Sequence, residues 1–185
     1  MKPRTMLTVL IGVSMALAIP ATALAQLGPY WTHIGAACVV DELDVNDYEV
    51  AYEEIYFKAG VTGSIQARCN VTNPDDQGDN PVWDRLGVTF KDPDATGTGA
   101  RIQAVLKKVT RSTGTSSTVA TFDSNRFAGT GWQFQATGVS HTWDFWNYYY
   151  YVDIVLSRTS SSLDVRLSGV MLYKLFGAST PDEQQ

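Results

Sequence analysis

Polar and apolar residues alternate one by one in several stretches of this chain, which is typical of β-strands with one face buried and the other in water. In SIQARCNVT (64–72), every second residue is apolar, namely Ile65, Ala67, Cys69 and Val71. The same alternation occurs in residues 85–92, 131–138 and 162–175. We therefore expect half-buried strands in all four stretches.

In the last two of these stretches, the alternation also predicts which side chains face the core. The apolar set is Trp132, Phe134 and Ala136 in the first, and Leu163, Val165, Leu167, Met171, Tyr173 and Leu175 in the second. We expect both sets to point inward, because the residues between them are mostly polar.

Four further stretches have weaker strand patterns, 35–41, 47–60, 100–111 and 117–124, and residues 146–158 are a ninth strand candidate. In residues 47–60 the apolar positions change phase, which predicts a bulge or a bend. Clusters of Gly, Asn, Asp, Pro and Ser separate the stretches, and no long amphipathic helical pattern occurs. About nine short strands of this kind predict an all-β fold: a single antiparallel β-sandwich, jelly-roll-like domain, with an up-and-down barrel as the alternative.

The first residues have the pattern of a secretory signal peptide. Lys2 and Arg4 precede an apolar segment of about 14 residues, too short to span a bilayer as a helix, and small residues lead to a cleavage site after Ala25. We therefore expect a secreted protein, periplasmic or extracellular, with no membrane span in the mature chain. The expected divisions are a signal peptide (1–25), an N-terminal extension (26–34), the β-sandwich domain (35–177) and a disordered acidic tail (178–185).

The cysteine pair and the net charge limit the kinds of site and binding partner that we expect. Cys38 and Cys69 are the two cysteines of the chain, and in an exported protein such a pair favours a disulfide over a metal or redox site. Removing Lys2 and Arg4 with the leader changes the net charge from −5 to −5 − 2 = −7. Nucleic acid is therefore not an expected partner, because phosphate binding needs clustered basic residues.

Residues that usually carry catalysis are scarce or unpatterned. His33 and His141 are the two histidines, and neither belongs to a recognised catalytic or cofactor motif. A pair of carboxylates, as in glycosidases, leaves no characteristic spacing in a sequence, so a hydrolase stays open as an alternative. We expect no cofactor.

Two acidic groups are candidate Ca²⁺ sites. The loop NPDDQGDNPVWD contains Asp75, Asp76 and Asp79, followed by Asp84, and their oxygens are ligands that Ca²⁺ prefers. The same residue types are typical of any long surface turn. A second group, Asp41, Glu42, Asp44 and Asp47, is more typical of a solvated connection.

The stretch HTWDFWNYYYYVDIVLSR (141–158) concentrates aromatic residues at the start of an expected strand. If residues 146–158 form one regular strand, alternate residues from Tyr148 to Leu156 face the core, and Tyr149 and Tyr151 face outward. Either the rings are structural, covered by a segment such as GPYWTHI (28–34), or they form a binding platform. The platform would consist of Trp143, Phe145, Trp146, Tyr149 and Tyr151.

Three functions fit these observations. The first is a non-catalytic exported β-sandwich that acts by association with a protein surface or with its own copies, as a surface, appendage or matrix component. The alternative is a carbohydrate-binding module that uses an exposed aromatic platform. The third is a glycosidase-like hydrolase, for which a deep cleft with two facing carboxylates is required.

Overall fold

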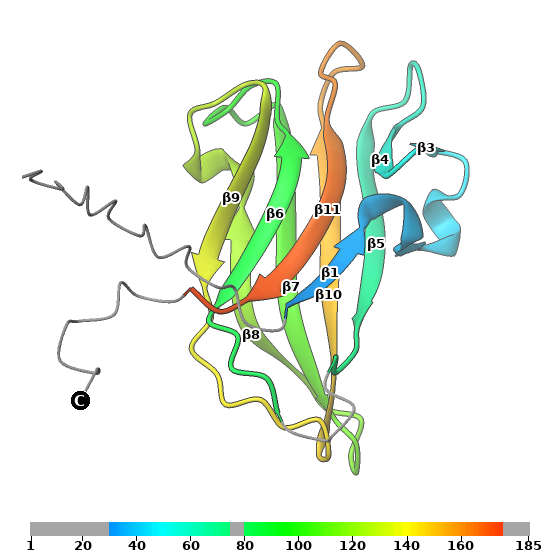
Figure 1. Ribbon diagram of the computed structural model, residues 1–185. Helices are drawn as coiled ribbons and strands as arrows, with labels where there is room; N and C mark the ends of the chain where they lie inside the picture. Colours follow the sequence, from blue (N-terminus) through cyan, green and yellow to red (C-terminus); the bar gives the residue numbers. More distant parts are fainter. Residues whose placement is uncertain (1–29, 75–79, 176–185) are drawn as a thin grey trace, which may run out of the picture.

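The computed structural model describes residues 30–74 and 80–175 as two antiparallel β-sheets packed face to face (Figure 1). From edge to edge, the six-stranded sheet contains β3 (Tyr48–Ala51), β4 (Glu54–Phe57), β11 (Arg166–Tyr173), β6 (Arg85–Lys91) and β9 (Trp132–Gly138), and β1 (Trp31–Ile34) also pairs with β11. The five-stranded sheet contains β2 (Val39–Val40), β5 (Gly63–Val71), β10 (Tyr148–Arg158), β7 (Ala100–Thr110) and β8 (Ser116–Asp123).

This arrangement confirms the predicted antiparallel β-sandwich, with eleven strands where about nine were expected. The helices among the described residues are single 3-10 turns, Gly35–Ala37, Glu42–Asp44 and Ser124–Arg126. None of these turns is long enough to cross a membrane. The expected signal peptide (1–25) and acidic tail (178–185) lie outside the described residues.

Inward-facing residues of both sheets form one hydrophobic core. On β10, Tyr150, Val152, Ile154 and Leu156 are buried, as the alternation predicts, whereas Tyr148 is only half-buried. The sheets meet through side chains such as Phe90 of β6 and Phe122 of β8, whose ring centroids lie 5.4 Å apart in an edge-to-face arrangement. Burial of these apolar side chains is the main source of stability for such a fold.

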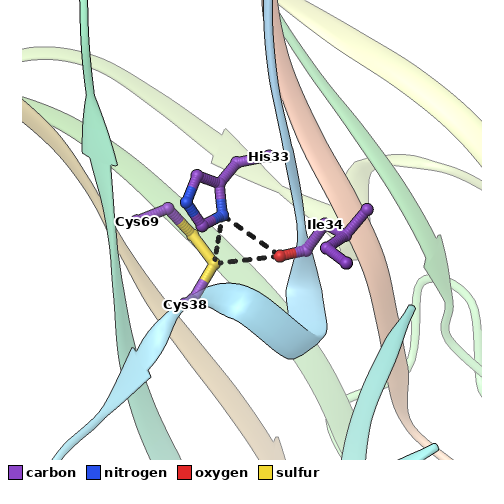
Figure 2. The surroundings of a disulfide bond; sticks show 4 residues. All are labelled: His33, Ile34, Cys38 and Cys69. Atoms are coloured by element: carbon purple, nitrogen blue, oxygen red, sulfur yellow. Dashed lines mark hydrogen bonds between the residues drawn. A yellow bond between two sulfur atoms is a disulfide. The ribbon is translucent and has the colours of Figure 1, made fainter. Parts of the chain in front are cut away.

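The N-terminal strand β1 lies within the expected extension 26–34, and its residues 31–34 pair with β11 in the six-stranded sheet. Trp31 is buried against the core, so the strand has an inward side to bury despite its weak alternation. His33 lies beside the disulfide between Cys38 and Cys69, which the structure confirms (Figure 2). Because both sulfurs are in this bond, the nearby His33 completes no metal site.

One local prediction is made more specific by the structure and another is wrong. The phase change in residues 47–60, where we expected a bulge or a bend, is the tight turn of a hairpin between β3 and β4, with Tyr52 at φ 58°. In β11 the register shifts between Leu167 and Gly169, so Met171 and Tyr173 face outward. The inward positions after this bulge are Val170 and Leu172, because one extra residue reverses the alternation.

Candidate functional site

The aromatic run before β10 is largely structural. Trp143 is 2% exposed, and its indole Nε1–H donates to the carbonyl oxygen of Trp83 at 2.9 Å. The rings of Trp83 and Tyr150 lie 4.9 and 4.8 Å from that of Trp143, and Phe145 stacks on it at 6.1 Å. Trp143 is thus covered by residues of the loops that precede β6 and β10, and by Tyr150 of β10. A buried ring of this kind offers no face to a ligand.

Hydrogen bonds between polar groups stabilise this cluster of rings around Trp143. The hydroxyl of Tyr150 lies 2.9 Å from Nε2 of His141 and accepts the backbone N–H of Asp144 at 3.1 Å. Asp144 in turn accepts the backbone N–H groups of Trp146 and Asn147. Burial lowers the pKa of His141, helped by the nearby charge of Lys108, so the neutral imidazole is favoured in this cluster.

The remaining three residues of the predicted platform are more open but do not gather on one surface. Trp146 is 75% exposed in the turn before β10, whereas Tyr149 and Tyr151 lie on the outer face of the five-stranded sheet. The guanidinium of Arg111 lies 4.4 Å from the ring centre of Tyr149, so that ring already has a cationic partner. Tyr151 borders a hollow of about 460 Å³ together with His33, Arg68 and Asn70.

The acidic groups give no calcium site among the described residues. Asp75, Asp76 and Asp79 lie outside the described residues, and Asp84 is engaged with Lys174 at 3.1 Å and with the N–H of Leu175. In the second group, Asp41 accepts the N–H of Leu43 and Asp44 accepts that of Gln66. These contacts are those of turn-stabilising carboxylates.

The hydrolase alternative requires two carboxylates that face a cleft. Asp92 and Asp94 are neighbouring carboxylates, and burial raises the pKa of Asp92 to about 6. Asp92 is fully buried and accepts the Ser124 hydroxyl, while Asp94 accepts the N–H groups of Gly99 and Ala100. Of four hollows lined by described residues, none includes two carboxylates.

A different pair of rings is exposed on β9. Trp132 and Phe134 are 48% and 49% exposed, which corrects the expectation that they point inward. Phe134 pairs with Thr89 of β6, whereas Gln133 pairs with the fully buried Phe90. Because residues directly opposite in an antiparallel pair share one face, the glutamines of β9 take the inner side and the rings take the outer side.

We call Trp132, Phe134 and Tyr173 the outer aromatic strip. The ring of Phe134 lies 6.2 Å from that of Tyr173 on β11 and rests on the backbone of Gly87. A Cβ atom on Gly87 would come within 2.7 Å of the Phe134 ring. The glycine is therefore required for this close approach of ring and sheet.

A shallow hollow of about 170 Å³ lies beside the strip on the same outer face. Its lining is formed by small or hydroxylated residues and two apolar ones, namely Thr32, Ile34, Gly87, Thr89, Ser168, Gly169 and Met171, together with His33 and Val170. The register places Phe134, Thr89, Gly169 and Ile34 opposite one another on successive strands. The hollow therefore runs across β6, β11 and β1, and the ring of Phe134 lies over Gly87, one of its lining residues.

Lys91, which lies opposite Trp132 in the register of β6 and β9, belongs to a group of charged residues that neutralise one another. Asp164 accepts from Lys91 at 2.7 Å and from Arg166 at 2.8 Å, and Arg166 also donates to Glu54 at 2.8 Å. Although burial acts against it, hydrogen bonds from Arg166 and Lys91 lower the pKa of Asp164 and keep it ionised. The two cations and two carboxylates of this group have no net charge.

No protein-family model matches the sequence, and no curated protein matches it. Three solved structures show a distant likeness. A xylan-binding module (CBM15) has 12% identity and a TM-score of 0.39 over 76% of this chain and 99% of its own. A family 11 carbohydrate-binding module of a cellulosomal cellulase from Clostridium thermocellum has 9% identity and a TM-score of 0.41 over 85% of this chain and 94% of its own.

The third is a family two carbohydrate esterase from Cellvibrio japonicus, with 11% identity and a TM-score of 0.38 over 82% of this chain. The matched region is 36% of the esterase, so this chain spans about a third of its length. At such TM-scores the likeness assigns no ligand or activity to this chain.

Sequence reasoning missed the outer aromatic strip, although a signal was present. In residues 132–138 the positions that alternate with Trp132, Phe134 and Ala136 are two glutamines and a threonine, which are compatible with either orientation at the edge of a sheet. The run GVT at 87–89 places a small and a hydroxylated residue on the side opposite Val88. Small residues on a neighbouring strand leave space for an aromatic ring on the outer face of the sheet.

Proposed function

We propose that this exported protein binds carbohydrate without acting on it, and that the outer aromatic strip and its hollow are the binding surface. The observation that carries this proposal is a pair of half-exposed rings, Trp132 and Phe134, beside a hollow floored by small residues. Exposed apolar rings on a soluble protein usually mark an interaction site.

The chemistry of the surface fits a sugar ring. The faces of Trp and Phe rings offer flat apolar area for the C–H face of a pyranose. The hydroxyls of Thr32, Thr89 and Ser168 line the hollow and can exchange hydrogen bonds with sugar hydroxyls. Because the charged group that includes Lys91 has no net charge, a neutral polysaccharide fits better than an acidic one.

Two tryptophans that differ in surroundings allow a matched test. Binding of soluble neutral and acidic polysaccharides is measured by affinity electrophoresis and calorimetry on the wild type, Trp132→Ala and Trp146→Ala. We expect a neutral polysaccharide to bind, and Trp132→Ala to weaken it about tenfold or more, as for a central aromatic contact. Trp146→Ala should leave the affinity unchanged, since this ring lies in a turn outside the strip.

Two outcomes contradict the proposal. One is a wild-type protein that retains no polysaccharide from the panel. The other is equal loss of binding in both variants, which would move the site away from the outer aromatic strip.

A further inference from the structure

β9 is an edge strand of the six-stranded sheet (Figure 1). Its backbone pairs with β6 on one edge, and among residues 30–74 and 80–175 no strand pairs with its other edge. β8 of the other sheet lies near β9 but forms no ladder with it. An unpaired edge presents backbone N–H and C=O groups in the spacing that another strand needs.

The other described sheet edges are protected in recognised ways. β2 has two residues, and β1 and β3 have four each, with Glu49 in β3. β8 is irregular, because its register with β7 shifts between Leu106 and Lys107. Short strands, charges and bulges all discourage pairing with another chain.

β9 has none of these protections. Its seven residues, WQFQATG, include no charged residue and no proline. Its register with β6 is uninterrupted from Arg85 opposite Gly138 to Lys91 opposite Trp132. The strand is therefore regular along its whole length and open on one side.

The sequence of β9 is also complementary to itself in the antiparallel direction. With Gln135 on a two-fold axis, Trp132 lies opposite Gly138 and Phe134 lies opposite Ala136 of the second copy. Large rings then face small residues on the same side of the sheet, as Phe134 already does above Gly87. We propose that β9 pairs with β9 of a second copy of this chain, forming a symmetric dimer through one continuous sheet.

The pairing would also extend the proposed sugar-binding surface. Opposite residues share a face, so Trp132 and Phe134 of both copies come together on the outer face of the joined sheet. This consequence rests on the proposed function, whereas the dimer does not. Since two short strands and four rings make a small interface, we expect a weak dimer that depends on protein concentration.

The test uses opposite charges at the axis. Gln135→Lys places two ammonium groups face to face across the two-fold axis, and Gln135→Glu places two carboxylates there. We expect each variant to raise the dimer Kd more than tenfold in sedimentation velocity, because like charges repel across an interface. An equimolar mixture of the two variants should form a heterodimer again, since the charges are then complementary.

Gln133→Lys is the matched control. It places the same charge on the same side of β9, but opposite Thr137 of the second copy, so it should change the dimer Kd less. Wild-type protein that stays monomeric over the whole soluble concentration range overturns the proposal. So does a dimer that neither Gln135 variant weakens, or a mixture that fails to recover it while both variants remain folded by circular dichroism. Polysaccharide binding by the monomeric variants tests the proposed function separately.

Discussion

The centre of the aromatic run of residues 141–151 and the outer aromatic strip have opposite relations to the surface. Trp143 and Tyr150 of the run are buried and Phe145 packs against them, although Trp146 and Tyr149 are exposed. The strip contributes two rings from β9 and leaves both about half exposed. The densest group of aromatic residues therefore lies partly in the core, whereas both rings of the sparse pair lie on the open face.

The difference comes from what lies opposite each ring. Trp143 is enclosed by the ring of Trp83, which comes from a distant segment of the chain, and by the ring of Tyr150 from the same run. Phe134 lies over Gly87 at a sheet edge, where no further layer covers it among the described residues. Burial follows from neighbours in space, so the same residue types stabilise the core in one place and are left open to solvent in the other.

The largest effect that would sharpen this contrast is expected for Trp143→Ala. Removing a buried indole leaves a cavity and leaves the carbonyl of Trp83 without its donor, so we expect a loss of about 3 to 5 kcal/mol in the free energy of unfolding. Denaturant unfolding measures it. A loss below about 1 kcal/mol would mean that the run is not part of the core.

Gly87→Ala is expected to act on the strip. The added Cβ would come within 2.7 Å of the Phe134 ring and must displace it, so polysaccharide affinity should fall, by about tenfold. Gly131→Ala, where a Cβ meets open space, is the control and should bind like the wild type. If calorimetry shows equal affinity for both variants, the position of Phe134 does not matter for binding.

We expect protonation of His141 at acidic pH to destabilise the packing of the aromatic run. Its pKa in the fold is lowered by burial, so its stabilising contribution is present above the ordinary histidine pKa of about 6.5 and is lost as the pH falls through the folded value. We expect the near-UV circular dichroism of the cluster to weaken on acidification from pH 7, less so in His141→Gln, which keeps a partner for the Tyr150 hydroxyl. The same titration in both proteins would contradict this role.

The smallest effect is expected for Trp146→Ala. This ring is 75% exposed, so its removal should change the free energy of unfolding by no more than about 0.5 kcal/mol. Thermal and denaturant unfolding check this value. A larger loss would show that the run is structural up to its last tryptophan, and would make the contrast with the strip sharper.

Several features followed directly from residue patterns. The alternation in residues 64–72 and 146–158 predicted the inward sides of β5 and β10, and the cysteine pair predicted the disulfide. β10 lies between β5 and β7, and β5 pairs with β10 along its whole length, so pattern and environment agree. The prediction was wrong for β9, whose edge position allows either orientation, and for the second half of β11, where a bulge reverses the faces.

The sequence by itself determined where polar and apolar residues alternate, and which residues of a regular strand share a face. Together these patterns predicted an antiparallel sandwich. Only the tertiary structure decided which side of β9 faces water and that Trp143 is enclosed. The reason is that period-two alternation is symmetric: it separates two faces without naming the inner one. The inner face is chosen by register, by bulges and by the second sheet, and these are contacts between residues far apart in the chain.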